Sequence, residues 1–386
     1  MSADTVRAMK VQSDTGVEQL DDRLVLTWGD GRRSTFHHLW LRDNCLCPSC
    51  RHPSVPERLV DTTSIPDDIA PADVELSPDD ELVIIWAGED HRSTFPLSWL
   101  ARHSYDDGPR PPAGESRILW TDGPPDPVPE VAYDDVMATD EGLRRWLVQL
   151  QRHGVSFIRD APTVPGTGPR IAERVAFLRN SNFGLLWDVV SKPDPDSLAY
   201  TAHALAPHVD LVSREMLPGV QLLHCLVFEA TGGDSLLVDG FACAAELATA
   251  DPNAYELLTT TPLPFRYRDG AGTDVSTRVP MIHLDHDGNF HEVRYSNALL
   301  APLDVPADQM LDTYRAVRTF ARLLRSGRFE LRLRLQPGDV MCFDNYRVLH
   351  GRSEFDPNSG HRHLQGCYLD RDDVLSRLRT LEATAE

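Results

Sequence analysis

A His-x-Asp pair, a second histidine far downstream and an arginine soon after it constrain this chain more than any other feature. The pair is His208 and Asp210, the distant histidine is His350, and Arg362 follows twelve residues later. Side chains two positions apart on a strand point to the same side, so one segment can supply two ligands. Two imidazoles and one carboxylate form the facial triad that suits Fe(II) and leaves coordination positions open. The guanidinium of Arg362 suits the far carboxylate of a dicarboxylate cosubstrate.

Spacing alone does not identify the iron site, because the chain contains a second His-x-Asp pair. His283 and Asp285 precede the polar sequence of residues 286–289, which is typical of a solvated turn at the tip of a hairpin. His208 instead precedes the apolar run of residues 219–228, which predicts a buried strand. We therefore assign the iron to the first pair and interpret the second as a surface turn.

The N-terminal region contains a near-repeat. Residues 24–41 and 82–100 each consist of an apolar strand ending in Trp, a polar turn, the sequence RSTF and a Trp-Leu pair. This pattern predicts two similar β-rich halves of one small domain.

Strand-like segments also dominate the rest of the chain, and they predict a mainly β fold with flanking helices and a barrel or jelly-roll-like core. The length of 386 residues is sufficient for two domains. A Pro-rich stretch that cannot continue a helix or a central strand marks the expected linker. The predicted division is a flexible tail at 1–19, an N-terminal domain at 20–122, a linker at 123–135 and a catalytic domain at 136–386.

Three cysteines within six residues indicate a second metal site. Cys45, Cys47 and Cys50 place three thiolates on one loop, one ligand short of a tetrahedral structural zinc site. His91 is the preferred fourth ligand, because it lies in the turn of the second repeat, which pseudo-symmetry places near this loop. His37 and His38 are the alternatives.

Composition restricts the partners. The formal charge is -21, from 38 basic and 59 acidic residues, which argues against nucleic acid and anionic membranes as partners. No apolar run predicts a transmembrane helix, and the N-terminus lacks the apolar stretch of a secretory signal. We therefore expect a cytoplasmic protein.

Three segments resemble the γ-butyrobetaine hydroxylase and trimethyllysine hydroxylase family of Fe(II)- and 2-oxoglutarate-dependent dioxygenases. They are GVQLLHCLVFEATGGDSLLVDG at 219–240, FDNYRVLHG at 343–351 and RHLQGCY at 362–368. The resemblance extends from about residue 20 to about residue 380. It implies a double-stranded β-helix (jelly-roll) catalytic domain preceded by a small zinc-binding domain, in a homodimer.

The resemblance also implies roles for individual residues. His208, Asp210 and His350 correspond to the iron ligands, and Arg362 to the residue that holds the distal carboxylate of 2-oxoglutarate. Ser235 and Leu223 fall at positions near the same cosubstrate. The family's zinc module has the same cysteine spacing and a later histidine, here His91. The implied cofactors are Fe(II), 2-oxoglutarate, structural Zn(II) and ascorbate as a supporting reductant.

Relatives in this family hold a trimethylammonium group in an aromatic cage through cation–π contacts. The matching positions are all aromatic here: Phe183, Trp187, Tyr200 and Tyr368. For the substrate's anionic end, Ser197 and Leu211 replace a polar amide and a tyrosine of the γ-butyrobetaine enzymes, and Asn297 is the remaining candidate.

The function expected from these residues is hydroxylation of a quaternary ammonium substrate with O2. γ-Butyrobetaine, which would give L-carnitine, is the first choice. The alternatives are another betaine, trimethyllysine or a trimethylaminoalkylphosphonate. A more distant alternative is a non-catalytic sensor that binds iron and 2-oxoglutarate, although an intact triad with Arg362 argues against it.

Overall fold

The computed structural model divides the chain into two compact units, Met1–Ala113 and Gly114–Glu386. The residues that it describes are 15–106, 108, 117–190, 201–270 and 272–383.

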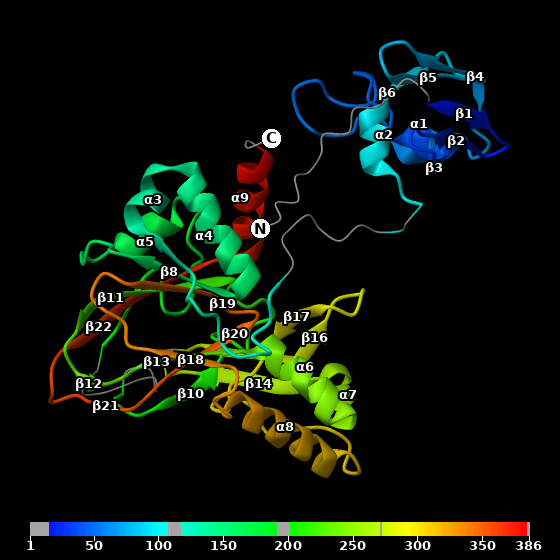
Figure 1. Cartoon of the computed structure of the whole chain (residues 1–386). Helices are drawn as coiled ribbons and strands as arrows, with labels where there is room; N and C mark the ends of the chain where they lie inside the picture. The colour runs from blue at the N-terminus through cyan, green and yellow to red at the C-terminus, as the bar shows by residue number, and fades with distance from the viewer. Residues whose placement is uncertain (1–14, 107, 109–116, 191–200, 271, 384–386) are drawn as a thin grey trace. The chain divides into compact units, whose positions relative to one another are not determined.

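The first unit contains two three-stranded antiparallel sheets, each followed by a short helix (Figure 1). The first sheet and its helix are β1 (Gly16–Gln19), β2 (Arg23–Thr27), β3 (Arg33–His37) and α1 (His38–Asp43). The second set is β4 (Pro71–Ser77), β5 (Glu81–Trp86), β6 (Arg92–Pro96) and α2 (Leu97–His103). A 3-10 turn at Thr62–Ser64 lies between the two sets in the sequence.

Equivalent side chains make equivalent contacts in the two halves of this unit, which confirms the predicted near-repeat. The Trp28 indole donates to Ser34 Oγ over 2.8 Å, and the Trp86 indole donates to Ser93 Oγ over 2.8 Å. Both halves contribute fully buried residues to one core: Leu24, Leu26, Phe36, Leu82, Ile84 and Phe95. Because each half covers the apolar face of the other, neither is expected to be stable alone.

Two larger sheets form the centre of the second unit. In spatial order, the six-stranded sheet is β7 (Glu130–Ala132), β8 (Val155–Arg159), β19 (Val340–Asp344), β11 (Val220–Phe228), β22 (Arg362–Leu369) and β9 (Trp187–Val189). The four-stranded sheet is β10 (Leu205–His208), β20 (Val348–Arg352), β13 (Ser235–Asp239) and β18 (Glu330–Leu333). Short two-stranded pairs complete it: β12 (Thr231–Gly232) with β21 (Phe355–Asp356), β14 (Leu263–Arg268) with β15 (Asp274–Val279), and β16 (Ile282–Leu284) with β17 (Phe290–Val293).

The inner faces of these two sheets share one hydrophobic core. Leu223 and Cys225 of β11 belong to the same buried cluster as Leu237 of β13 and Leu349 of β20. The alternate residues of β11, such as Leu222, lie in a second cluster with helical side chains. The strand is therefore apolar on both faces, as the run at 219–228 predicts. The double-stranded β-helix expected from the resemblance is confirmed.

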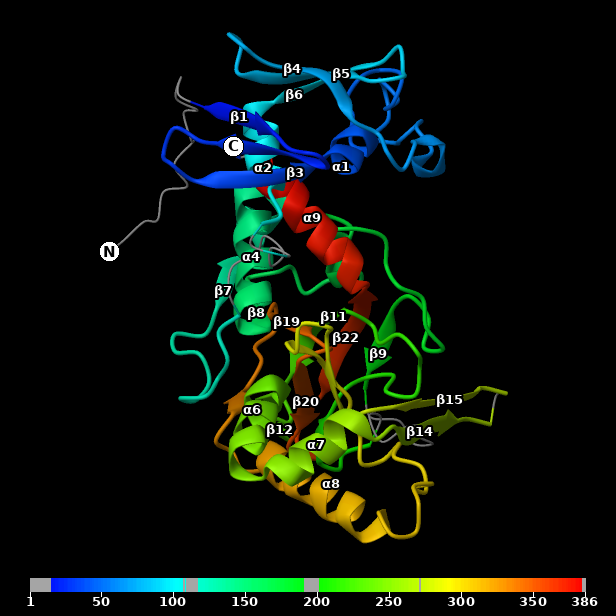
Figure 2. The same ribbon diagram turned by 90° about the vertical axis from the view of Figure 1, so that its right-hand side faces the viewer.

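Helices cover the outer face of the six-stranded sheet and one end of the fold (Figures 1 and 2). The covering helices are α3 (Tyr133–Ala138), α4 (Asp140–His153), α5 (Thr167–Ala172) and α9 (Arg371–Ala383). The end group is α6 (Gly240–Ala250), α7 (Pro252–Thr260) and α8 (Met310–Leu324). Within the described residues, no helix is long and apolar enough to cross a membrane.

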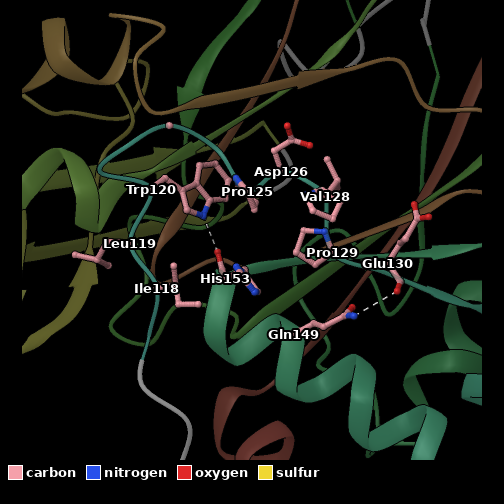
Figure 3. A pocket seen from close by; sticks show the side chains of 12 residues that line it. Ile118, Leu119, Trp120, Pro125, Asp126, Val128, Pro129, Glu130, Gln149 and His153 are labelled. Atoms are coloured by element: carbon pink, nitrogen blue, oxygen red, sulfur yellow. Dashed lines mark hydrogen bonds between the residues drawn. The ribbon is translucent and has the colours of Figure 1, made fainter. Parts of the chain in front are cut away.

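The Pro-rich segment before β7 is fixed by contacts within the second unit. The backbone N–H of Trp120 donates to the carboxylate of Asp239 over 3.0 Å. Its indole donates to the carbonyl of His153 over 2.9 Å (Figure 3). This segment and the end of α4 enclose a cavity of about 620 Å³. The cavity shares no lining residue with the one that contains the proposed iron ligands.

The buried histidine of β11 gives stability a pH dependence. His224 has no exposed surface, and neither ring nitrogen has a hydrogen-bond partner among the described residues. Burial lowers its pKa from 6.5 to about 4. Between these two values the unfolded chain binds more protons than the folded chain, so stability is lost as the pH falls. The loss from this group between pH 7 and pH 5 is about 2 kcal/mol.

Replacing His224 with leucine is expected to remove this contribution. Urea denaturation of the wild type and of His224→Leu at pH 7 and pH 5 measures it. The wild type should lose about 2 kcal/mol more than the variant on acidification. Other titrating groups are common to both proteins and cancel in the comparison. An equal loss in the two proteins would contradict the assignment.

Candidate active site and metal centres

The three proposed iron ligands converge from two adjacent strands. His208 ends β10 and His350 lies opposite it on β20, as direct partners in the antiparallel ladder. Their ring centroids are 4.4 Å apart. Asp210 follows β10 by two residues, and its Oδ1 lies 3.6 Å from Nε2 of His208 and 3.8 Å from Nε2 of His350. All three ligand atoms lie within 4.8 Å of one another, so that one ion can lie between them.

Hydrogen bonds orient two of these ligands. The carbonyl of Ala206 lies 2.9 Å from Nδ1 of His208, which places the ring proton there and leaves Nε2 available. The Tyr368 hydroxyl donates to Oδ2 of Asp210 over 2.6 Å. Asn345 accepts from the backbone N–H of Asp210 over 2.9 Å and donates to its carbonyl over 3.2 Å. The aspartate is therefore held at both its backbone and its carboxylate.

The protonation states favour metal binding at two of the three groups. Burial raises the pKa of Asp210, but the nearby His350 and His208 outweigh it, so the pKa is well below its usual range. Burial lowers the pKa of His350 to about 4. Burial also opposes charge on His208, yet the neighbouring Asp210 carboxylate raises its pKa above 6.5. Asp210 is therefore a carboxylate and His350 a neutral imidazole at pH 7, and at His208 metal binding competes with protonation.

The second His-x-Asp pair is a surface turn, as the sequence predicts. Asp285 accepts hydrogen bonds from the backbone N–H groups of Asp287 and Asn289, over 3.0 and 2.9 Å. His283 lies on β16 with about half of its side chain exposed, 51%. Its carboxylate neighbour at 3.8 Å is Glu292 rather than Asp285. No cluster of metal-ligating residues forms here among the described residues.

Arg362 opens β22 and is buried between two aromatic rings. Its guanidinium carbon lies 5.1 Å from the Phe228 centroid and 5.7 Å from the Phe355 centroid. Only 8% of the residue is exposed, and its Nε has no hydrogen-bond partner among the described residues. Burial lowers its pKa to about 9. A buried cation without a carboxylate partner is costly, and a bound carboxylate would offset that cost.

The two other residues predicted near the cosubstrate lie on neighbouring strands. Leu223 of β11 pairs with Gly366 of β22, the strand that begins at Arg362. Ser235 of β13 pairs with Arg352 of β20, two residues beyond His350. Both Ser235 and Leu223 are buried. The strands that carry these two positions are therefore hydrogen-bonded neighbours of the strands that carry His350 and Arg362.

A cavity of about 650 Å³ opens next to the triad. His208 and Asp210 line it, together with four residues predicted to contact the substrate: Phe183, Trp187, Asn297 and Tyr368. The Trp187 and Tyr368 rings have centroids 4.2 Å apart, and Phe183 lies 6.4 Å from Trp187. Leu211 also lines the cavity. Tyr200 and Ser197 lie outside the residues that the structure describes.

The cavity also contains residues that the sequence analysis missed. They are Tyr267, Arg266 and Arg268 on β14 and Arg214 in the turn after Asp210. Tyr267 stands 6.4 Å from Phe183, edge to face. The alternation of Leu263, Phe265 and Tyr267 marks one face of a strand, but it does not indicate that this strand borders the site.

The cysteine loop of the first unit forms a compact four-ligand cluster with His91. Nε2 of His91 lies 3.3 Å from Cys45 Sγ, 3.8 Å from Cys47 Sγ and 3.6 Å from Cys50 Sγ. Sulfur and nitrogen ligands of one tetrahedral zinc lie about 3.5 Å apart, given bonds of about 2.3 and 2.0 Å. The donor set and its spacing therefore fit a closed structural zinc site.

The surroundings of the cluster explain why His91, rather than its rivals, completes it. Nδ1 of His37 lies 2.8 Å from the Tyr105 hydroxyl, and His38 is outside the cluster. Arg42 donates to Cys50 Sγ over 3.4 Å and forms an ion pair with Glu89 at 2.7 Å. A zinc ion with three thiolates carries a net negative charge, which the Arg42 guanidinium partly neutralises.

Loss of one thiolate is expected to remove this metal. Cys47→Ser should lower zinc from one ion per chain to none after mild chelation, because a hydroxyl is a poor zinc ligand. Elemental analysis and thermal unfolding of the purified protein measure both consequences. Ser49→Ala, a change in an exposed residue of the same loop, should retain the zinc. Full zinc retention in Cys47→Ser would exclude the site.

Comparison with known proteins agrees with this arrangement. The model of the taurine catabolism dioxygenase TauD, TfdA family matches residues 121–368, and that of the gamma-butyrobetaine hydroxylase-like N-terminal domain matches residues 16–101. The chain is 44% identical to gamma-butyrobetaine dioxygenase of Pseudomonas sp. (strain AK-1), over 92% of this chain and 93% of the relative.

More distant relatives include both enzymes named in the resemblance. Trimethyllysine dioxygenase of Meyerozyma guilliermondii is 33% identical, over 93% of this chain and 94% of the relative. Human gamma-butyrobetaine dioxygenase is 32% identical, over 94% of this chain and 95% of the relative. The resemblance inferred from the sequence is thus confirmed. The chain belongs to the TauD, TfdA dioxygenase family, in the branch with a gamma-butyrobetaine hydroxylase-like N-terminal domain, and it is a 2-oxoglutarate-dependent dioxygenase.

Proposed function

We propose that this enzyme hydroxylates γ-butyrobetaine to L-carnitine, with Fe(II), 2-oxoglutarate and O2. The observation that carries the proposal is the cavity in which His208 and Asp210 share walls with the aromatic side chains of Phe183, Trp187 and Tyr368. A metal triad and a cation-binding surface in one enclosure would place a trimethylammonium substrate next to the iron. The 44% identity to a bacterial gamma-butyrobetaine dioxygenase supports the same substrate.

The protein residues in this proposal position the reactants. His208, Asp210 and His350 hold the iron, and Arg362 holds the far carboxylate of 2-oxoglutarate, with Ser235 and Leu223 beside it. When bound, the iron and the cosubstrate supply an oxidative decarboxylation to succinate and CO2 that delivers one oxygen atom to a substrate C–H bond. The hydrogen bond from Tyr368 to Asp210 links the metal ligand to the substrate-binding wall.

The aromatic wall is suited to a quaternary ammonium group. Such a cation cannot donate hydrogen bonds, so its recognition depends on ring faces, each of which contributes about 0.5–2 kcal/mol. Trp187 and Tyr368 are inclined at 36° to each other, which gives two non-parallel faces of one corner. Phe183 and Tyr267 extend the same wall.

Comparison of γ-butyrobetaine with its carbon isostere tests the proposed function. In 5,5-dimethylhexanoate a neutral tert-butyl group replaces the trimethylammonium group, with nearly the same shape. γ-Butyrobetaine should stimulate succinate formation from 2-oxoglutarate with Fe(II). The isostere should be a less efficient stimulant by about 10-fold or more. Equal stimulation by the two compounds, or none by either, would contradict the proposal.

Gly366 provides the space that Trp187 occupies. A Cβ at position 366 would lie 2.5–2.7 Å from three atoms of the Trp187 indole. Trp187 is partly exposed and lies on the edge strand β9, so it can move aside without unfolding the sheet. Residue 366 therefore sets the position of one wall of the cavity.

Gly366→Ala is expected to impair substrate binding selectively. The displaced indole should raise KM for γ-butyrobetaine about 10- to 100-fold, with KM for 2-oxoglutarate changed less than about 3-fold. Initial rates at varied concentrations of each compound measure the two effects. Gly168→Ala is a suitable control, because its Cβ would meet nothing closer than 3.8 Å. A similar rise in both KM values would contradict the role of Gly366.

Trimethyllysine is the second candidate substrate, because trimethyllysine dioxygenases from yeast and human are 33% and 34% identical to this chain. Other betaines and trimethylaminoalkylphosphonates complete the substrate panel. We further propose that the protein is a cytoplasmic homodimer and that ascorbate supports its turnover.

A further inference from the structure

We propose that Arg214 binds the carboxylate end of the substrate and thereby sets the specificity of the enzyme. The inference rests on the proposed function, since it concerns the far end of the molecule whose ammonium group faces the aromatic wall. Of the residues expected near that end, Leu211 lines the cavity without a polar group, and Asn297 offers an uncharged amide that cannot neutralise a carboxylate.

The turn after Asp210 is held rigidly by a buried arginine. Arg294 is 2% exposed and pairs with Glu292 at 2.7 Å. Its other N–H groups donate to three carbonyls of this turn, those of Val212, Arg214 and Glu215. The backbone N–H of Arg214 also donates to the Leu211 carbonyl over 2.9 Å. The backbone of Arg214 is thus fixed four residues beyond a proposed iron ligand.

The side chain of Arg214 lines the substrate cavity with spare hydrogen-bonding capacity. Its Nη2 donates to the Asn182 amide oxygen over 3.1 Å, and Asn182 lines the same cavity. A guanidinium has five N–H donors arranged to bind a carboxylate in two-point fashion. Among the described residues, no carboxylate forms an ion pair with Arg214. The neighbouring amide can therefore orient this side chain while leaving donors for a ligand.

The charge around the cavity also favours an anion. Among the described residues, the lining includes three arginines, Arg214, Arg266 and Arg268, and one carboxylate, Asp210. Arg266 and Arg268 share a single partner, Asp274, at 2.6 and 2.7 Å. Asp210 is committed to the triad and Tyr368. This part of the cavity is thus locally cationic in a chain whose formal charge is -21, which attracts an anionic group there.

This arrangement separates the two candidate substrates. γ-Butyrobetaine ends in a carboxylate alone, which can bind Arg214 directly. Trimethyllysine ends in a carboxylate and an α-ammonium group, and the second of these would be repelled by the neighbouring guanidinium groups. The preferred substrate class is therefore a trimethylammonium compound with a terminal anion and no amino group beside it.

A double-mutant-type cycle, which combines one residue change with one substrate change, tests whether Arg214 binds the substrate carboxylate. The substrates are γ-butyrobetaine and its amide, 4-(trimethylammonio)butanamide, which has nearly the same shape without the charge. Wild-type enzyme should prefer the acid over the amide in kcat/KM by about 20- to 100-fold, as expected for a charge-assisted two-point contact. Arg214→Gln, which can still donate to Asn182, should reduce that preference to less than about 3-fold.

Further measurements distinguish a wrong role for Arg214 from a wrong proposed function or a damaged iron centre. KM for 2-oxoglutarate in Arg214→Gln should stay within about 2-fold of wild type, which confirms a folded iron centre. Arg318→Gln removes one positive charge from an exposed position of α8 outside the cavity. This control variant should retain the preference for the acid over the amide. An unchanged acid-to-amide preference in Arg214→Gln overturns this inference alone. Absence of turnover with γ-butyrobetaine in the wild type overturns the proposed function and this inference with it.

Discussion

Asp210→Ala is expected to reduce substrate-stimulated turnover of 2-oxoglutarate on the order of 1,000-fold or more, because it removes one of three protein ligands to the iron. The remaining histidines stay in place on paired strands, so the loss reflects the metal and not the fold. Fe(II) binding to the purified, metal-free protein should weaken in parallel. Activity assays and metal titration on the same preparation measure both effects.

The chain provides a matched control in its second His-x-Asp pair. Asp285→Ala makes the same chemical change in the same sequence pattern, but Asp285 only caps a surface turn through the N–H groups of Asp287 and Asn289. Turnover should remain within about 2-fold of wild type, with a stability loss of about 1 kcal/mol at most. Equal losses in the two variants would contradict the assignment of the iron to His208, Asp210 and His350.

Arg362→Met is expected to raise KM for 2-oxoglutarate about 100-fold or more, because loss of one partner from a desolvated charge pair costs about 3–5 kcal/mol. The same change should leave the cosubstrate-free protein at least as stable as wild type. Methionine keeps the packing between Phe228 and Phe355 and removes a buried guanidinium that has no carboxylate partner among the described residues. Steady-state kinetics and thermal unfolding without cosubstrate measure the two opposite effects.

Arg334→Met is the control for this variant. Arg334 also lies over the Phe228 ring, at 4.2 Å, but its guanidinium donates to the carbonyls of Gly232 and Ala230. Its loss should leave KM for 2-oxoglutarate within about 3-fold and lower stability, since two carbonyls lose their partners. If both variants raised KM for 2-oxoglutarate equally, Arg362 would have no special role in binding it.

The sequence could predict the parts of the structure that depend on local pattern. The apolar run containing Leu222 and Leu223 indicates a strand buried on both faces, and the structure has one. The Trp86 half of the near-repeat predicts a turn close to the cysteine loop, and His91 in that turn completes the cluster. Polar residues after Asp285 correctly indicate a turn.

The missed residues depend on contacts between distant segments. Tyr267 and Arg214 reach one cavity from a hairpin and from the turn after Asp210, and no local pattern specifies that meeting. Asn345 lies within a recognised motif, but its hydrogen bonds to Asp210 join two segments that are 135 positions apart in the sequence and follow strands of different sheets. Patterns of period two identify strands, whereas the order of strands in a sheet follows from long-range packing.

The proposed function requires that the aromatic cavity and the triad act on one bound molecule of γ-butyrobetaine. The most direct test is the ratio of L-carnitine to succinate formed by the Fe(II)-loaded enzyme with 2-oxoglutarate and O2, measured by NMR of the reaction mixture. We expect about one L-carnitine per succinate from the wild type, and neither product above background from Asp210→Ala. Succinate formed at the same rate without γ-butyrobetaine, or with no hydroxylated product, would contradict it.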